Sequence, residues 1–87
     1  MDITAEQKPQ IDYPTRWNYR IVCTSESAIR AHIAEFFADR PYDLEVGRHS
    51  SGGKYVSMHL SLTVNDEAER LSVFDEMSKH ETVRFVL

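Results

Sequence analysis

The stretch from residue 56 to residue 64 constrains the fold more than any other part of the chain. Every even-numbered residue from Val56 to Val64 is apolar, and every odd-numbered residue between them is polar. A period of two residues is typical of a β-strand with one buried face, because successive side chains point to opposite sides of a sheet. The sequence therefore predicts a long strand here, with one face in the core and the other outside it.

Three further strands and two helices are predicted around this strand. The strands occupy residues 17–23, 42–49 and 82–87, and the first helix follows a cap at Thr24 or Ser25 and ends near Asp39, before Pro41. Asn65 is the predicted N-cap of the second helix. A tight turn at Ser51-Gly52-Gly53 joins the second and third strands, and glycine suits the positive φ of short hairpin loops.

The apolar positions predict which faces of these elements are buried. In the helices, i, i+3 and i+4 spacing selects one stripe per helix, and in the last strand alternation selects two residues. The predicted inward residues are Ile29, Ile33, Phe36 and Phe37 in the first helix, Leu71, Phe74 and Met77 with Ala68 in the second, and Val83 and Phe85 in the last strand.

The order of elements predicts an α+β, ferredoxin-like βαββαβ sandwich. Right-handed crossovers give a four-stranded antiparallel sheet in the order 4-1-3-2, with two helices on one face. Matching the apolar faces of the central hairpin predicts its register. The predicted cross-strand pairs are Leu44 with Leu60, Val46 with Met58, Glu45 with His59, and His49 with Tyr55.

Length and composition indicate one small domain. The chain has 87 residues, and we assign residues 1–12 to a flexible N-terminal tail and residues 13–87 to a single domain. The first ten residues lack the apolar core of a signal peptide, and no apolar run is long enough to span a membrane. A single cysteine, Cys23, forms no internal disulfide, so we expect a reduced, cytoplasmic protein.

The net charge of −4 is concentrated in one element. Residues 65–81 carry six acids and two bases, so this stretch accounts for all of the negative charge. Nucleic-acid-binding domains usually show a basic excess on one face, so the composition makes nucleic acid an unfavoured partner.

Three short segments resemble the YbeD family of small bacterial proteins, whose biochemical function is unassigned. They are Tyr13-Pro14-Thr15 before the first strand, Ser50-Ser51-Gly52-Gly53-Lys54-Tyr55 in the hairpin, and Val83-Arg84-Phe85-Val86-Leu87 at the end of the chain. Gly53 departs from the family pattern, in which a polar residue often follows the first glycine. The resemblance implies a ferredoxin-like fold similar to ACT domains and a regulatory or ligand-sensing role, and it implies no catalytic residues.

The outward positions of the sheet are the candidate ligand-binding surface. Because both helices cover one side, these side chains face solvent, a ligand or another subunit, and a solvated polar face is the plain alternative. The candidate residues are Arg20, Glu45, His49, Tyr55, His59 and Arg84.

Two pairings within this surface suggest specific chemistry. Glu45 beside His59 is either a pH-responsive pair or an ordinary cross-strand charge pair. Arg20 and Arg84 either bind an anion together or pair with neighbouring acids. No short ligand motif supports a metal at His49, His59 and Glu45, so neither a metal nor a cofactor is predicted.

The hairpin turn is a second candidate site. Ser51, Gly52, Gly53 and Lys54 are a candidate anion nest, in which backbone N–H groups and a lysine hold a phosphate or carboxylate. A turn that uses glycine only for its geometry explains the same residues.

These observations favour a small, non-catalytic regulatory or interaction module that senses a small metabolite. Unpaired strand edges invite association, so a homodimer through a sheet edge or face is expected, with an unknown protein or a metabolite as further partner. The alternative is an RNA-binding module that uses the open sheet face. An acylphosphatase-like enzyme is disfavoured, because Thr24-Ser25-Glu26-Ser27 lacks the glycine and arginine of a phosphate-binding loop.

Overall fold

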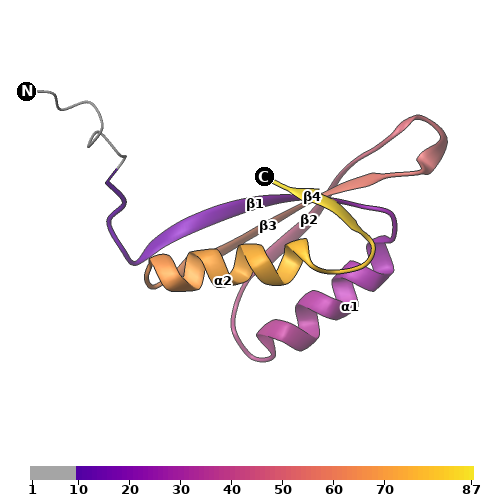
Figure 1. Ribbon diagram of the computed structural model, residues 1–87. Helices are drawn as coiled ribbons and strands as arrows, with labels where there is room; N and C mark the ends of the chain where they lie inside the picture. The colour runs from indigo at the N-terminus through magenta and orange to yellow at the C-terminus, as the bar shows by residue number, and fades with distance from the viewer. Residues whose placement is uncertain (1–9) are drawn as a thin grey trace, which may run out of the picture.

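The structure is a computed structural model that describes residues 10–87; most of the predicted tail lies outside the described residues. The chain forms one four-stranded antiparallel sheet and two helices (Figure 1). The elements are β1 (Thr15–Cys23), α1 (Glu26–Phe37), β2 (Asp43–His49), the short 3-10 turn η2 (Ser51–Gly53), β3 (Val56–Val64), α2 (Glu67–Ser78) and β4 (Val83–Val86).

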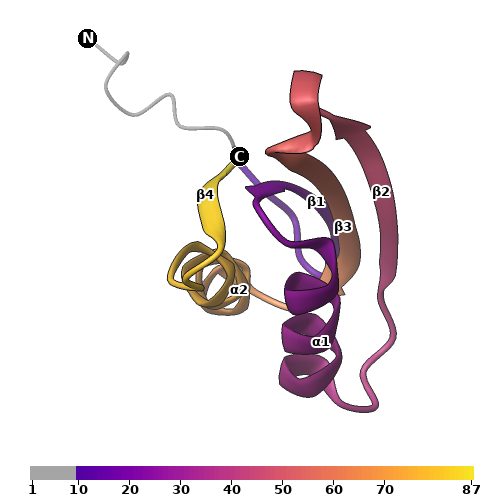
Figure 2. The same ribbon diagram turned by 90° about the vertical axis from the view of Figure 1, so that its right-hand side faces the viewer.

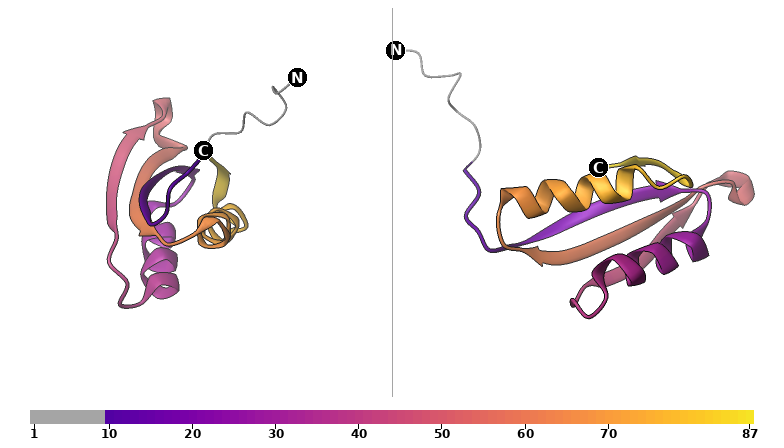
Figure 3. Two further views of the ribbon diagram at one scale, coloured as in Figure 1. Left: turned by 90° about the vertical axis from the view of Figure 1, so that its left-hand side faces the viewer. Right: turned by 60° about the horizontal axis from the view of Figure 1, so that its bottom comes forward.

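The strand order is β2-β3-β1-β4, which confirms the predicted topology. Both helices lie on one side of the sheet and leave the opposite face uncovered (Figures 2 and 3). Neither helix within residues 10–87 is long and apolar enough to cross a membrane.

The core lies between the sheet and the helices. Tyr19, Ile21 and Cys23 of β1 and the five inward residues of β3 are almost inaccessible to solvent, as are Ile29, Ile33 and Phe37 of α1. The Ser25 side chain accepts a hydrogen bond from the Ala28 backbone N–H at 3.2 Å and caps α1. The amphipathic pattern of α1 therefore predicted its buried face correctly, except that Phe36 remains exposed.

The predicted cap of α2 is wrong, and of its predicted inward residues only Met77 is buried; Ala68 is exposed. The N-cap is Asp66, whose carboxylate accepts from the Glu69 backbone N–H at 2.8 Å. Val73 and Met77 are the buried residues, whereas Leu71 and Phe74 are 48% and 42% exposed. The reason is that β4 is short and pairs with β1 only at one end, so no strand among residues 10–87 covers the part of β1 beside Leu71 and Phe74.

The predicted orientation of Phe85 is also wrong. Val22 pairs with Phe85, but Cys23 pairs with Val83, so a bulge at Arg84 interrupts the alternation of β4. Val83 and Val86 are consequently buried, and Phe85 is 50% exposed on the same face as Val22.

A second bulge, in β2, makes the register of the central hairpin differ from the predicted one at its turn end. The pairs Leu44–Leu60, Val46–Met58 and Glu45–His59 form as predicted, but His49 pairs with Val56 rather than with Tyr55. β2 contains one more residue than β3 between these pairs, and an extra residue shifts every pair that follows it.

Candidate functional site

The uncovered face of the sheet carries one row of titratable side chains across three strands. His59 on β3 lies between Glu45 on β2 and Arg20 on β1, because both residues are its direct cross-strand partners. All three side chains are exposed. The row divides this face into an acidic part toward the start of β2 and a basic part toward the hairpin.

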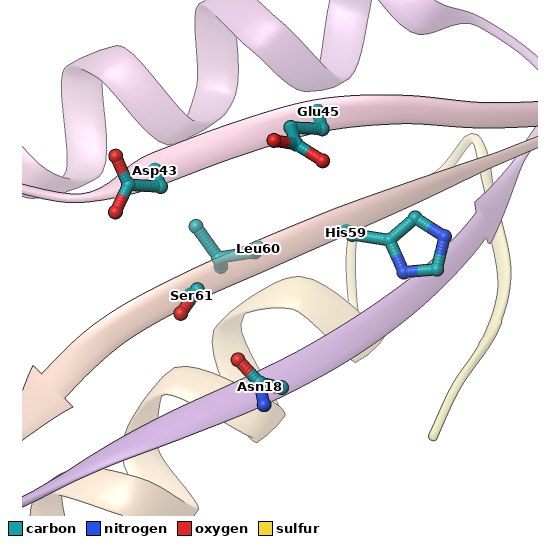
Figure 4. Close-up of a pocket in the computed structure, with 6 residues that line it drawn as sticks. All are labelled: Asn18, Asp43, Glu45, His59, Leu60 and Ser61. Carbon is teal, nitrogen blue, oxygen red and sulfur yellow. The ribbon is translucent and has the colours of Figure 1, made fainter.

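The acidic part is an open hollow of about 560 Å³ (Figure 4). Asp43 and Glu45 enter it from β2, His59 and Ser61 from β3, and Asn18 from β1. A guanidinium nitrogen of Arg16 lies 2.7 Å from an Asp43 carboxylate oxygen and donates to the Ser61 hydroxyl at 3.0 Å. Arg16 therefore neutralises Asp43, and Glu45 is the acid of this hollow that makes no ion pair within residues 10–87.

His59 does not form the predicted ion pair with Glu45. The two residues are cross-strand neighbours, but no histidine nitrogen lies within 4 Å of a Glu45 oxygen. The imidazole lies instead against Gly47 in the bulge of β2. A Cβ at Gly47 would lie 2.8 Å from Nε2 of His59 and 3.1 Å from the Ser57 carbonyl oxygen. The absence of a side chain at Gly47 therefore provides the space that the imidazole occupies.

The basic part is a second hollow of about 420 Å³, which we call the hairpin hollow. All four strands contribute to it, and its polar groups are Arg20, Arg48, His49, Ser50 and Ser57. Its apolar and aromatic groups are Val22, Tyr55, Val56 and Phe85. Within residues 10–87, neither Arg20 nor Arg48 has a carboxylate partner. Two unpaired guanidinium groups and an exposed phenyl ring thus share one concave surface.

The structure brings five of the six predicted ligand-binding residues to these two hollows. Arg20, His49 and Tyr55 line the hairpin hollow, and Glu45 and His59 line the acidic hollow. Arg84 lies in the bulge of β4, is exposed and lines neither hollow.

Val22, Arg48 and Phe85 are among the residues of the hairpin hollow that sequence reasoning did not select. Alternation from Val83 assigned Phe85 to the core, although the apolar residue that follows it, Val86, interrupts that alternation. Val22 did carry a signal, since it is an apolar residue at an outward position of a strand whose other outward residues are polar.

Hydrogen bonds internal to the hairpin turn hold the proposed anion nest. Ser50 accepts the Gly53 N–H at its carbonyl and the Tyr55 N–H at its hydroxyl, both at 2.8 Å. Gly52 and Gly53 have φ of 86° and 74°, as the sequence predicted for the turn. The ammonium of Lys54 lies 5.4 Å from the centre of the Tyr55 ring. Anion binding at Ser51–Lys54 stays a prediction.

Residues 10–87 contain no group of three or more histidine, cysteine, aspartate or glutamate side chains placed to hold a metal ion. The single thiol, Cys23, is fully buried, and burial raises its pKa. A neutral, inaccessible thiol is a poor nucleophile, so Cys23 serves as a packing residue.

Comparison with known proteins identifies relatives but no activity. A family model described as "Protein of unknown function (DUF493)" matches residues 8–87. An uncharacterized protein of Helicobacter pylori strain J99 is 34% identical over 82 residues, which cover 93% of this chain and 94% of that protein. An uncharacterized protein of Campylobacter jejuni is 30% identical over 82 residues, covering 94% and 92% of the two chains.

A solved structure has the same fold. The solution structure of Helicobacter pylori protein HP0495 superimposes with a TM-score of 0.83 at 29% sequence identity, over 100% of this chain and 96% of that one. The agreement in fold extends over the whole sandwich. The names of these relatives and of the solved structure mention no ligand.

Proposed function

Because the chain belongs to the DUF493 family, whose description assigns no function, we propose a function from its own surface: a non-catalytic binding module that senses an anionic small metabolite in the hairpin hollow. One observation carries the proposal. Arg20 and Arg48 have no carboxylate partner within residues 10–87, and they line the same hollow as the exposed side chain of Phe85.

The chemistry of the hollow suits a ligand with two different ends. A guanidinium group forms paired, charge-assisted hydrogen bonds with a carboxylate or a phosphate. Val22, Tyr55 and Phe85 offer apolar contact to the remainder of the molecule. Binding sites for small molecules commonly combine an apolar lining with a few polar groups that orient the ligand.

The position of the hollow supports a regulatory role. Arg20, Arg48, Ser57 and Phe85 come from four different strands, so one ligand touches β1, β2, β3 and β4 at once. A ligand that binds only the folded sheet stabilises it by mass action. The buried, reduced thiol of Cys23 agrees with a cytoplasmic location, where a metabolite sensor would act.

The test is a titration with three small probes: phenyl phosphate, inorganic phosphate and benzylamine. We expect phenyl phosphate to bind most tightly, because it fills both ends of the hollow. It should raise the melting temperature and shift the amide NMR signals of Arg20, Arg48 and Phe85. Benzylamine has the same ring and the opposite charge, so it should not bind.

Matched variants locate the site. Arg48→Gln and Phe85→Ser should each weaken binding of phenyl phosphate by about tenfold, the loss expected for one charge-assisted hydrogen bond or one buried contact. Arg30→Gln removes an exposed arginine from α1, where it pairs with Glu26, and should leave binding unchanged. Equal binding of benzylamine, or equal loss in Arg30→Gln, would show that the hollow does not select anions.

A second candidate function, RNA binding, is favoured by the outward orientation of Phe85. With Tyr55 it places two aromatic rings beside Arg20 and Arg48, and bases stack on such rings. The outward residues of the central strands are otherwise non-aromatic, and the net charge is −4. Fluorescence anisotropy with a labelled single-stranded RNA at physiological salt distinguishes the two functions: tight RNA binding that Phe85→Ser abolishes would replace the metabolite proposal.

A further inference from the structure

β1 is much longer than the strand that pairs with its outer edge. β4 pairs with residues 21–23 of β1, and the Leu87 backbone extends this pairing to Arg20. The other half of β1, residues 15–19, has no strand on that side within residues 10–87. Figure 1 shows this half of β1 running beyond the end of β4, above α2 in that view.

The main chain of this half of β1 presents donors and acceptors at the open edge. The N–H of Arg20 donates to the Leu87 carbonyl at 3.0 Å, and the Arg20 carbonyl accepts from the Leu87 N–H at 2.9 Å. Main-chain groups of alternate residues in an antiparallel strand point to the same side. The main-chain N–H and C=O groups of Asn18 and Arg16 therefore point to the same open edge of β1 as those of Arg20. Within residues 10–87, the main-chain groups of Asn18 have no hydrogen-bond partner at this edge.

An apolar groove lies beside this edge on the helical side of the sheet. It has a volume of about 290 Å³ and is lined by Trp17, Tyr19, Arg70, Leu71, Phe74 and Leu87. The guanidinium carbon of Arg70 lies 4.8 Å from the centre of the Trp17 ring, and its Nε donates to the Tyr13 hydroxyl at 2.9 Å. These contacts hold the floor of the groove in place.

We propose that a partner protein binds here by adding an extended segment to the edge of β1. A strand that pairs with residues 15–19 directs every second side chain into the groove, between Trp17 and the exposed side chains of Leu71 and Phe74. Such a segment occupies about five residues, or roughly 17 Å. An extended peptide satisfies both features, since it supplies main-chain partners for Asn18 and apolar side chains for the groove.

The charges of β1 specify the other side chains of the partner segment. The outward residues along this part of β1 are Arg16, Asn18 and Arg20. Arg16 already pairs with Asp43 across β3, so Arg20 is the arginine here that has no carboxylate partner within residues 10–87. Acidic side chains on the outward face of an added strand complement this charge as diagonal neighbours of Arg20. The partner segment therefore alternates apolar residues, which face the groove, with acidic residues, which face the open side of the sheet.

The same charges disfavour a second copy of this chain as the occupant. Two β1 edges that pair antiparallel would bring Arg20, which has no carboxylate partner within residues 10–87, beside an arginine of the other chain. Like charges in these positions are destabilising. The inference shares Arg20 with the metabolite proposal and differs from it in the aromatic residue that it uses, because Phe74 and Phe85 line hollows on opposite sides of the sheet.

The test uses short synthetic peptides with isotope-labelled protein. One peptide alternates glutamate with valine, and its control alternates lysine with valine. We expect the glutamate peptide to bind, to protect the Asn18 amide from hydrogen exchange, and to shift the indole signal of Trp17. We expect the lysine peptide to bind at least about tenfold more weakly, because it places like charges near Arg20.

Exposed positions provide variants that retain the fold. Phe74→Ser should weaken binding of the glutamate peptide by about tenfold or more, as is typical of a central aromatic contact. Phe85→Ser is the matched control, since it removes an equally exposed phenylalanine from the opposite face, and it should leave peptide binding unchanged. The two variants also separate this inference from the metabolite proposal. That proposal predicts that Phe85→Ser weakens the binding of phenyl phosphate and that Phe74→Ser leaves it unchanged.

Several results would overturn the inference. Absence of binding by both peptides would do so, as would equal binding of the lysine peptide. Slow exchange of the Asn18 amide in a peptide-free monomer would show that the edge is already covered. A concentration-dependent dimer, seen by light scattering, with Asn18 protected without peptide would assign the edge to a second copy.

Discussion

At the scale of single residues, Gly47 and His59 show how a side chain on the open face is positioned. Gly47 has no positive φ, so its backbone alone would tolerate alanine. A Cβ at this position would nevertheless lie 2.8 Å from Nε2 of His59. The need for glycine therefore comes from the imidazole and from the Ser57 carbonyl oxygen, which would lie 3.1 Å from the Cβ, and not from a positive φ.

This assignment predicts that the effect of Gly47→Ala depends on residue 59. In the native background it should lower the free energy of unfolding by about 1 kcal/mol, because the imidazole is displaced. In a His59→Ala background the same change should cost less, because only the close contact with the Ser57 carbonyl oxygen remains and alanine restricts the unfolded chain. Urea unfolding of the four proteins of this cycle measures both effects. Equal effects in the two backgrounds would contradict the assignment.

Tyr19 joins β1 to α2 and gives the fold a dependence on alkaline pH. Its hydroxyl donates to the Arg70 carbonyl oxygen at 2.7 Å, and burial raises its pKa to about 12. The unfolded tyrosine has a pKa near 10, so the folded state holds its proton more tightly. The resulting stabilisation is complete below about pH 10 and is lost as the pH rises to about 12.

We therefore expect the native protein to lose about 2 kcal/mol of unfolding free energy through Tyr19 between pH 10 and 12. Tyr19→Phe should remove that part of the pH dependence. At pH 7 it should cost about 1 kcal/mol for the lost hydrogen bond. Chemical unfolding at several pH values, compared between the two proteins, checks the difference. Parallel pH profiles would show that Tyr19 ionises normally in the folded state.

At the scale of elements, the start of α2 is held by reciprocal hydrogen bonds. Asp66 accepts from the Glu69 N–H, and the Glu69 carboxylate accepts from the Asn65 N–H at 2.6 Å. Arg40 of the loop after α1 also forms an ion pair with Glu69, which lowers the pKa of that carboxyl group. Glu69 thus links the cap of α2 to the end of α1.

These hydrogen bonds predict different stability effects for alanine at two adjacent positions, 65 and 66. Asp66→Ala should lower the unfolding free energy by about 1 kcal/mol, because it leaves the Glu69 N–H without its acceptor. Asn65→Ala should have little effect, since Asn65 takes part through its backbone N–H. Thermal unfolding followed by circular dichroism compares the two. A larger loss in Asn65→Ala would favour the cap that the sequence alone suggested.

At the scale of the whole molecule, the acids that carry the net charge and the arginines of the hairpin hollow lie on opposite sides of the sheet. The acids of residues 65–81 belong to α2 and its flanks on the helical side, whereas Arg20 and Arg48 face the open side of the sheet. An acidic protein thereby keeps a local site for anions. The net charge alone does not reveal this site, because it sums over both faces.

This arrangement predicts a salt effect on binding. The affinity for phenyl phosphate should fall several-fold between about 0.02 M and about 0.5 M sodium chloride, because exposed charges are screened over a shorter distance at higher salt. The affinity of the Arg48→Gln protein should depend less on salt. Calorimetric titration at a series of salt concentrations measures both slopes. A salt-independent affinity would place the phosphate away from the arginines.

Local patterns in the sequence determined the architecture and much of the candidate surface. The alternation of residues 56–64 and the stripe Ile29–Ile33–Phe37 are local patterns, and they predicted β3 and the buried face of α1. Matching the apolar faces of the hairpin also predicted that Glu45 and His59 are cross-strand neighbours. Arg20 and Tyr55 were assigned to the outward face for the same reason.

Only the tertiary structure decided what depends on the length and register of neighbouring strands. The bulges at Arg84 and after Val46 shift alternation by one residue, which turns Phe85 outward and moves His49 away from Tyr55. The shortness of β4 leaves Leu71 and Phe74 exposed. A buried apolar residue and an exposed one are the same residue type, and the neighbouring backbone decides between them.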